Sequence, residues 1–208
     1  METLTGLLKK GQEILVQAGI EEAGLDARLL LEYITGKSRA YYLAHGEECV
    51  TKETADRYLE LVTGRSQHIP LQHLTHQAFF MGYEFYVNED VLIPRQDTET
   101  LVEEALRLLK GRQKPRVLDM CTGSGCILTS ILLEVPDASG TGADLSEKAL
   151  KVAACNARRL QTADRAEFVK SDLFSSEYFS GSVYDVLISN PPYIPTEEIE
   201  GLMEEVRL

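Results

Sequence analysis

The sequence predicts an α/β protein in which a small all-α domain and a β-hairpin precede a parallel sheet. The chain has 208 residues, which is about one and a half domains at roughly 150 residues each. Apolar residues recur with helical spacing in its first part, whereas its second part alternates short apolar strands with amphipathic helices, as in parallel sheets. We therefore expect a helical domain over residues 1–70, a linker with a hairpin over 71–93 and an α/β domain over 94–208.

Four helices are expected in the first 65 residues. The first begins at Leu4 and stops before Gly19, and the second covers Leu25–Ile34. Ser38 and Thr51 are suitable N-cap residues for the third and the fourth, because their hydroxyl groups accept hydrogen bonds from free backbone N–H groups. Together these helices predict a small bundle.

The pattern changes after the bundle. The aromatic segment Phe79–Val87 predicts a strand pair around Gly82, and Asp97 is a suitable N-cap for a helix that ends at Lys110. Beyond it, strands are expected over Arg116–Met120, Thr141–Asp144, Glu167–Ser171 and Tyr184–Ser189. Helices are expected over Ser124–Leu133, over Ser146–Leu160 with Ser146 as its N-cap, and over Thr196–Val206. Helices are expected on both faces of this sheet, with a ligand beyond the carboxyl ends of its strands where the strand order reverses.

Composition and charge exclude several classes of protein. Hydrophobic residues make up 44% of the chain, as in ordinary globular proteins. A net charge of −12 argues against DNA or RNA as the main ligand and favours a basic protein partner, because nucleic-acid binding rests on cations. The absence of a long apolar segment or a secretion signal predicts a soluble cytoplasmic protein. The cysteines and histidines lack zinc-ligand spacing, which predicts no metal site and reduced, mostly buried thiols.

The first strand of the sheet, which contains Asp119, leads into a glycine loop, Cys121 to Gly125, which opens a helix. Glycines allow close approach of the backbone to a ligand, and the helix start presents free N–H groups. The loop is not a dinucleotide fingerprint, because Leu128 stands where the third glycine would be, and a P-loop lysine is absent. A tight strand-to-helix turn remains an alternative interpretation.

Two further acids stand at the ends of the next strands. Asp144 lies 19 residues beyond Gly125 (144 − 125), a spacing at which a carboxylate accepts from ribose hydroxyls. Asp172 follows the third strand, where it would accept from an exocyclic amine of adenine. Each acid alone also suits a helix cap or a solvated charge. Jointly they predict a nucleoside site without a phosphate clamp, which suggests S-adenosylmethionine with Asp119 near its methionine part.

The fourth strand ends in Asn190-Pro191-Pro192-Tyr193. Prolines fix φ and lack an N–H, so carbonyl oxygens project from a stiff backbone. A rigid turn is the alternative. In the functional interpretation, Asn190 Oδ1 and the Pro191 carbonyl accept the two hydrogens of a planar NH₂ group, and Tyr193 stacks on it. Such alignment contributes up to about 7–11 kcal/mol and needs no ionised base.

These segments resemble the HemK-type protein-(glutamine-N5) methyltransferases, which modify peptide chain release factors. The resemblance covers the whole chain and is most specific at Val91–Glu99, at the glycine loop and at Asn190–Ile194. It implies a Rossmann-like S-adenosylmethionine-dependent methyltransferase sheet, with S-adenosylhomocysteine as product. It also implies that the helical domain docks a release factor and that the acceptor is the glutamine of a Gly-Gly-Gln loop.

The resemblance also implies two sets of site residues. Cofactor contacts are expected from Asp119, Cys121, Thr122, Gly123, Gly125, Asp144, Asp172, Leu173 and Asn190. The glutamine is expected to face Asn190, Pro191, Pro192 and Tyr193, with Asn190, Pro191 and Tyr193 in the catalytic role.

The chain departs from the family pattern in a few places. Leu173 stands where an aromatic residue is common, and Cys121 where a glycine is common. Arg95 and Glu99 suit either an active-site wall or ordinary surface and first-turn charges. A sheet of this type continues through another strand–helix unit and an antiparallel strand pair, so the catalytic domain is expected to be incomplete at its C-terminal end.

Two rival functions remain. A DNA adenine-N6 or cytosine-N4 methyltransferase would use the same Asn-Pro-Pro-Tyr turn, but it needs a basic groove and a base-flipping pocket that a charge of −12 does not supply. An inactive adaptor of the same fold is the other, and the intact tetrapeptide argues against it.

Overall fold

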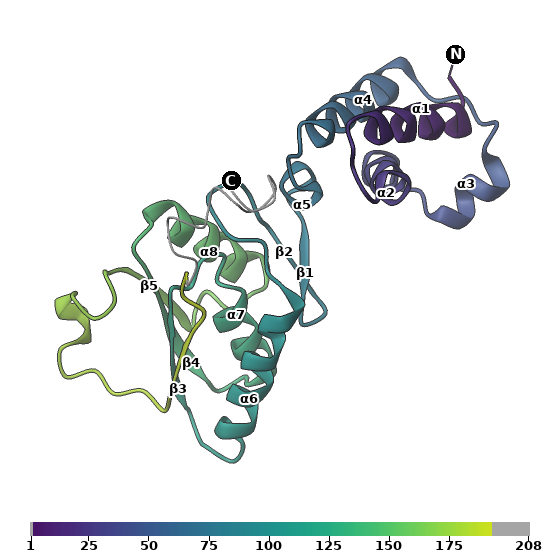
Figure 1. Cartoon of the computed structure of the whole chain (residues 1–208). Coiled ribbons are helices and arrows are strands. Elements are labelled where there is room, and N and C mark those ends of the chain that lie inside the picture. The colour runs from purple at the N-terminus through teal and green to yellow at the C-terminus, as the bar shows by residue number, and fades with distance from the viewer. Residues whose placement is uncertain (1, 193–208) are drawn as a thin grey trace. The chain divides into compact units, whose positions relative to one another are not determined.

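The computed structural model describes residues 2–192, which form two compact units, residues 2–75 and 76–192 (Figure 1). Tyr193 and the predicted helix Thr196–Val206 lie outside the described residues. Each unit is described by itself.

The first unit is a helical bundle built around one apolar core. Its helices are α1 (Leu4–Gln17), α2 (Ala23–Thr35), α3 (Arg39–His45), α4 (Lys52–Ser66) and α5 (Leu71–Thr75). The largest side chains without solvent exposure in its core are Leu7, Leu15, Leu30, Leu31, Tyr58 and Val62. The four helices expected from the sequence are confirmed, and α5 is an addition that packs on α2 and α4.

One close approach explains a glycine inside α1. A Cβ atom at Gly11 would lie 2.0 Å from the hydroxyl oxygen of Tyr58, so only glycine lets the Tyr58 ring cross the helix there. The hydroxyl continues to α2 and donates to the Ala27 carbonyl over 3.1 Å. Arg65 of α4 makes a second buried link to α2 through Asp26, at 2.6 Å.

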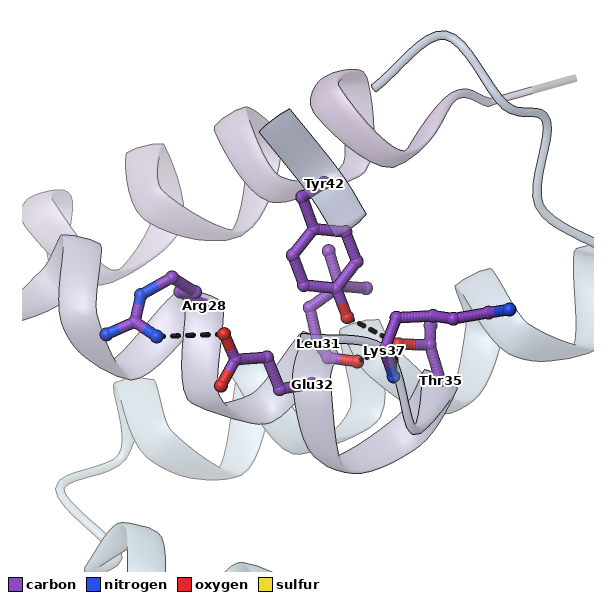
Figure 2. A network of polar contacts seen from close by, with 6 residues as sticks. All are labelled: Arg28, Leu31, Glu32, Thr35, Lys37 and Tyr42. Atoms are coloured by element: carbon purple, nitrogen blue, oxygen red, sulfur yellow. Dashed lines mark hydrogen bonds and ion pairs between the residues drawn. The ribbon is translucent and has the colours of Figure 1, made fainter. Parts of the chain in front are cut away.

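Hydrogen bonds order the connection between α2 and α3 (Figure 2). The Thr35 hydroxyl donates to the Leu31 carbonyl over 2.7 Å and accepts from the Lys37 N–H over 3.2 Å. It also contacts the hydroxyl of Tyr42, which comes from α3. Ser38 stands at the N-cap of α3 but makes no capping bond through its side chain, whereas the predicted cap Thr51 accepts from the Thr54 N–H over 3.1 Å.

The second unit begins with the predicted hairpin. Strands β1 (Ala78–Phe80) and β2 (Tyr83–Phe85) pair antiparallel, and Gly82 between them has a φ of +78°. A 3₁₀ turn, η1 (Gln96–Thr98), then leads into α6 (Glu99–Leu109). The expectation that Asp97 caps this helix is wrong, because the added turn moves the N-cap to Thr98.

A four-stranded parallel sheet forms the centre of this unit. Its strands are β3 (Arg116–Met120), β4 (Ser139–Asp144), β5 (Ala166–Lys170) and β6 (Val186–Ser189), in the order β5-β4-β3-β6. Helices α7 (Cys126–Glu134) and α8 (Glu147–Arg159) connect the first three strands. The predicted parallel α/β fold is confirmed.

The two faces of the sheet are covered differently. Helices α6, α7 and α8 gather on one face, where Val117 and Ile188 join the core. On the other face Leu118 packs against Phe179 and Tyr184. Both come from the connection between β5 and β6, which contains a single 3₁₀ turn, η2 (Glu177–Phe179). The expectation of helices on both faces is therefore wrong for residues 76–192.

The strand order reverses at β3. The chain passes from β3 through β4 to β5 on one side and then returns to place β6 on the other side of β3. Met120 and Ser189, the last residues of β3 and β6, are ladder partners. The glycine loop and the Asn-Pro-Pro turn therefore leave the sheet next to each other.

Several expectations concern features that the described residues lack. Within residues 2–192 no helix has the length and apolar content of a membrane span, and no three His, Cys, Asp or Glu side chains gather as metal ligands in this part of the chain. All four cysteines are free, but only Cys126 is buried. The prediction of mostly buried thiols is therefore wrong.

Candidate functional site

The glycine loop after β3 has three residues with positive φ: Cys121 at +62°, Gly123 at +52° and Gly125 at +75°. A Cβ atom at Gly123 would meet nothing within 4 Å, whereas at Gly125 it would lie 2.9 Å from the Cβ of Ala153. Gly123 therefore leaves open space beside the loop. Gly125 serves the close packing of α7 against α8.

Asp119 lies directly beneath this loop and is fully buried. Its Oδ2 accepts from the Thr122 hydroxyl over 2.6 Å and from the Leu128 N–H over 3.3 Å. Among residues 2–192, nothing donates to its Oδ1. Burial raises the pKa of this carboxyl to about 7, against the lowering effect of the Thr122 and Leu128 hydrogen bonds.

Asp144 ends β4 and braces the loop from the side. Its Oδ2 accepts from the Gly123 N–H over 2.9 Å, and its Oδ1 accepts from the Ser146 N–H over 2.9 Å. A carboxylate has about four lone-pair positions, so each oxygen keeps one for a further donor. Ser146 itself caps α8 by accepting from the Ala149 N–H over 3.2 Å, as its sequence position predicted.

Asp172 and Leu173 follow β5 at the same edge of the sheet. The Ser171 N–H donates to the Asp144 carbonyl over 3.0 Å, which places these two residues next to the end of β4. The Leu173 side chain is 54% exposed, and its backbone has a φ of +50°. Both residues are therefore accessible to a ligand at this edge.

The Asn-Pro-Pro turn is tied to its surroundings by two hydrogen bonds. The Ser189 hydroxyl donates to the Met120 carbonyl over 2.8 Å, which joins the ends of β6 and β3. Asn190 Nδ2 donates to Thr98 Oγ1 over 3.3 Å. Pro191 and Pro192 are exposed, and Tyr193 lies outside the described residues. The structure thus brings Asn190 beside the glycine loop, as the topology predicted.

Thr98 is the contact that sequence reasoning missed. It belongs to the Ile-Pro-Arg-Gln-Asp-Thr-Glu segment, in which only Arg95 and Glu99 were considered for the site. Glu99 occupies the first turn of α6 and accepts from the Met81 N–H of the hairpin over 2.7 Å. Arg95 is exposed, and its carbonyl accepts from the Thr98 N–H over 3.0 Å. This segment therefore connects the hairpin to the Asn-Pro-Pro turn.

Two surface hollows are lined by residues that do not belong to this edge. One, of about 700 Å³, is lined by Tyr42–Glu48 and Thr5 of the helical unit. The other, of about 330 Å³, lies between the residues after β2 and α8, including Asn88 and Lys148. Neither hollow is lined by the glycine loop or Asn190. The candidate site is therefore located by the reversal of strand order and not by the volume of a hollow.

Comparison with known proteins gives a family match in each of the two parts of the chain. The family model described as the PrmC N-terminal domain matches residues 6–75, and the one described as the methyltransferase small domain matches residues 97–205.

Three curated relatives all bear the name release factor glutamine methyltransferase. That of Chlorobaculum tepidum is 38% identical over 97% of this chain and 71% of its own length. That of Bordetella pertussis is 41% identical over 94% of this chain and 71% of its own length. That of Bacillus subtilis is 37% identical over 100% of this chain and 72% of its own length. Each alignment therefore includes both the helical and the α/β part of the chain.

Proposed function

The chain belongs to the family of release factor glutamine methyltransferases, and we propose that it methylates the side-chain amide nitrogen N5 of the glutamine in the Gly-Gly-Gln motif of a peptide chain release factor. The family predicted from the sequence is thereby confirmed. The observation that carries the proposal is the position of Asn190 beside the glycine loop, at the point where the strand order reverses. The methyl donor is S-adenosylmethionine, and S-adenosylhomocysteine is the product.

The residues after β3 and β4 fit this cofactor. S-adenosylmethionine, when bound, supplies a methyl group on an electron-poor sulfonium sulfur. Asp119 offers a buried oxygen that has no donor among residues 2–192 and suits the ammonium of the methionine part, and Asp144 retains lone pairs that suit ribose hydroxyls. Gly123 leaves room for close approach. We assign supporting contacts with the cofactor to Cys121, Thr122, Gly125, Asp172, Leu173 and Asn190.

The Asn-Pro-Pro turn provides acceptors for the glutamine amide. Asn190 Oδ1 and the Pro191 carbonyl each accept one N–H of the amide, which leaves the nitrogen lone pair perpendicular to its plane. Their dipoles also stabilise the positive charge that develops on this nitrogen. The product nitrogen loses its proton readily, so no ionised base is needed. Pro192 stiffens the turn, Tyr193 stacks on the amide, and the helical domain over residues 1–70 docks the release factor.

Cofactor affinity is expected to rise as the pH increases from 6 to about 7.5. Below its pKa of about 7 Asp119 is mostly protonated and a poor partner for an ammonium group, and an α-amino group has lost half of its own charge at about pH 7.7–8. Titration calorimetry with S-adenosylmethionine at several pH values measures this profile. Asp119→Asn should give a flat profile between pH 6 and 7.5, and an equal slope in both proteins would contradict the assignment.

The same carboxyl affects folding in the opposite direction. In the unfolded chain the group ionises near its usual pKa of 3.8, whereas the folded chain keeps the proton up to about 7. The unfolded state therefore releases its proton first as the pH rises, and without cofactor the contribution of Asp119 to the free energy of unfolding falls between about pH 4 and 7. Over this pH range the cofactor affinity is expected to rise while the contribution of Asp119 to stability falls. A gain in stability therefore cannot explain a rise in affinity in the titration.

The alternatives are weaker for this chain. A DNA amino-methyltransferase would need a basic surface, whereas the net charge is −12. We therefore propose that the chain does not bind nucleic acid stably. We also propose a cytoplasmic location with the translation machinery. An inactive adaptor would have no use for the acceptor geometry around Asn190.

Transfer of a labelled methyl group tests the proposal. We expect label from S-adenosylmethionine to appear in the Gly-Gly-Gln glutamine of a purified release factor, located by mass spectrometry of the tryptic peptide. A release factor with this glutamine replaced by alanine is the control and should remain unlabelled. Label that appears only in duplex DNA would favour the rival enzyme, and its absence from every substrate would favour the adaptor.

A further inference from the structure

The Asn190 side chain is held by a residue from outside the sheet. Its Nδ2 donates to Oγ1 of Thr98, which lies 92 residues earlier in the sequence, at the start of α6. The oxygen and the nitrogen of an amide share one planar carbon, so fixing Nδ2 also fixes the direction of Oδ1. We propose, on the basis of the function proposed above, that Thr98 is a positioning residue that keeps Asn190 Oδ1 turned toward the glutamine amide.

Helix capping does not explain this threonine. A threonine at an N-cap normally adopts an extended backbone and accepts a hydrogen bond from the first turn of its helix. Thr51 and Ser146 of this chain do so. Thr98 instead has a helical backbone, with φ −73° and ψ −18°, and makes no capping bond through its side chain. Its hydroxyl is therefore available to Asn190.

Thr98 is also a rigid point of attachment. Its side chain is β-branched, which restricts χ1, and the residue is only 9% exposed. Helix α6 is anchored in the core through Val102 and Leu109, which are 0% and 2% exposed. At its first turn, Glu99 accepts from the Met81 N–H over 2.7 Å. The hydroxyl that receives Asn190 is thus fixed before any substrate arrives, as catalytic groups require.

Loss of this hydroxyl has a specific chemical consequence. The terminal torsion of an asparagine side chain is broad and roughly two-fold, so an unrestrained amide also presents its NH₂ group to the substrate. If this NH₂ group faces the NH₂ group of the glutamine, both groups are donors and no hydrogen bond forms between them. The hydrogen bond is 3.3 Å long in the free protein, and such bonds commonly tighten when the substrate binds.

A valine substitution at Thr98 tests the role by a split between turnover and binding. Thr98→Val keeps the shape and removes the hydroxyl, and we expect kcat for release factor methylation to fall by about fivefold to tenfold. The dissociation constant of S-adenosylmethionine and the melting temperature should stay unchanged. Thr98→Ser, which restores a hydroxyl, should recover most of the lost turnover.

Thr100→Val is the matched control. Thr100 is exposed in the first turn of α6, two residues after Thr98, and its hydroxyl donates to the Asp97 carbonyl over 2.7 Å, so kcat should match that of the wild-type chain. A Thr98→Val protein with wild-type kcat, or a Thr98→Ser protein as slow as Thr98→Val, would overturn the role of Thr98 alone. A wild-type chain without turnover would instead contradict the proposed function, and this inference with it.

The NMR signals of the Asn190 side-chain amide give a readout that is independent of turnover. They are identified by their loss in Asn190→Ala. Thr98→Val should shift them, and Thr100→Val should leave them in place. Identical Asn190 signals in the wild-type and Thr98→Val proteins would contradict the hydrogen bond itself.

Discussion

Replacement of Asn190 by alanine is expected to lower kcat for glutamine methylation by at least about 100-fold, which corresponds to about 3 kcal/mol of transition-state stabilisation. The variant loses the oxygen that accepts one N–H of the substrate amide, while the Pro191 carbonyl remains. The amide is then held at one hydrogen and rotates, so its lone pair is no longer directed at the methyl group. Steady-state rates with a saturating release factor measure the loss.

Cofactor binding separates this role from a structural one. The glycine loop is braced by Asp144 and Thr122, without help from the Asn190 side chain. The dissociation constant of S-adenosylmethionine should therefore change by less than about tenfold. Asn88→Ala is the matched control, because Asn88 contacts Asp90 in a loop after β2 and should keep wild-type turnover. Equal losses of turnover and cofactor affinity in Asn190→Ala would show that Asn190 mainly holds the cofactor.

The second large effect is expected at Gly125. Alanine at a φ of +75° costs about 1–2 kcal/mol through backbone strain. Its Cβ would also lie 2.9 Å from the Cβ and 3.1 Å from the Cα of Ala153, and overpacking of this kind adds about 1–3 kcal/mol. Gly125→Ala should therefore lower the free energy of unfolding by about 2–5 kcal/mol in urea denaturation. It should also weaken cofactor binding, because α7 and the loop must move.

Gly111 offers a matched comparison within the same unit. It follows α6 with a φ of +81°, but a Cβ there would meet nothing within 4 Å. Gly111→Ala should therefore cost only the strain, about 1–2 kcal/mol, and leave the cofactor affinity unchanged. If both variants lose the same stability, the contact between α7 and α8 is not tight enough to require glycine at Gly125.

Local patterns predicted most elements of this fold. Periodicity located the helices of the bundle, and the alternation of strands and helices gave the parallel sheet. Thr51 and Ser146 were identified as caps because capping depends on a residue and its next three neighbours. The prediction that Asp97 is a cap was wrong, because Asp97 lies within a 3₁₀ turn, η1, that precedes α6.

Topology accounts for which of the candidate site residues lie together. The strand order brings the glycine loop and Asn190 together through backbone pairing, independently of side-chain contacts. The finer contacts depend on long-range packing, which periodicity does not describe. Nothing near Thr98 in the sequence indicates that its hydroxyl meets Asn190, and Asp144 was expected to serve a ribose, whereas it also braces Gly123. The lack of a helix on the second face of the sheet, as far as residues 76–192 show it, had no local signature either.

The pairing of Met120 with Ser189 in one ladder has a consequence for how this enzyme family diversifies. The loop assigned to the methyl donor and the turn assigned to the acceptor leave neighbouring strands, so their starting points are separated by the interstrand spacing of about 4.8 Å. Substitutions in the helical bundle leave that spacing unchanged. Under the docking role proposed above for the bundle, a change of protein client therefore leaves the starting points of the loop and the turn unchanged.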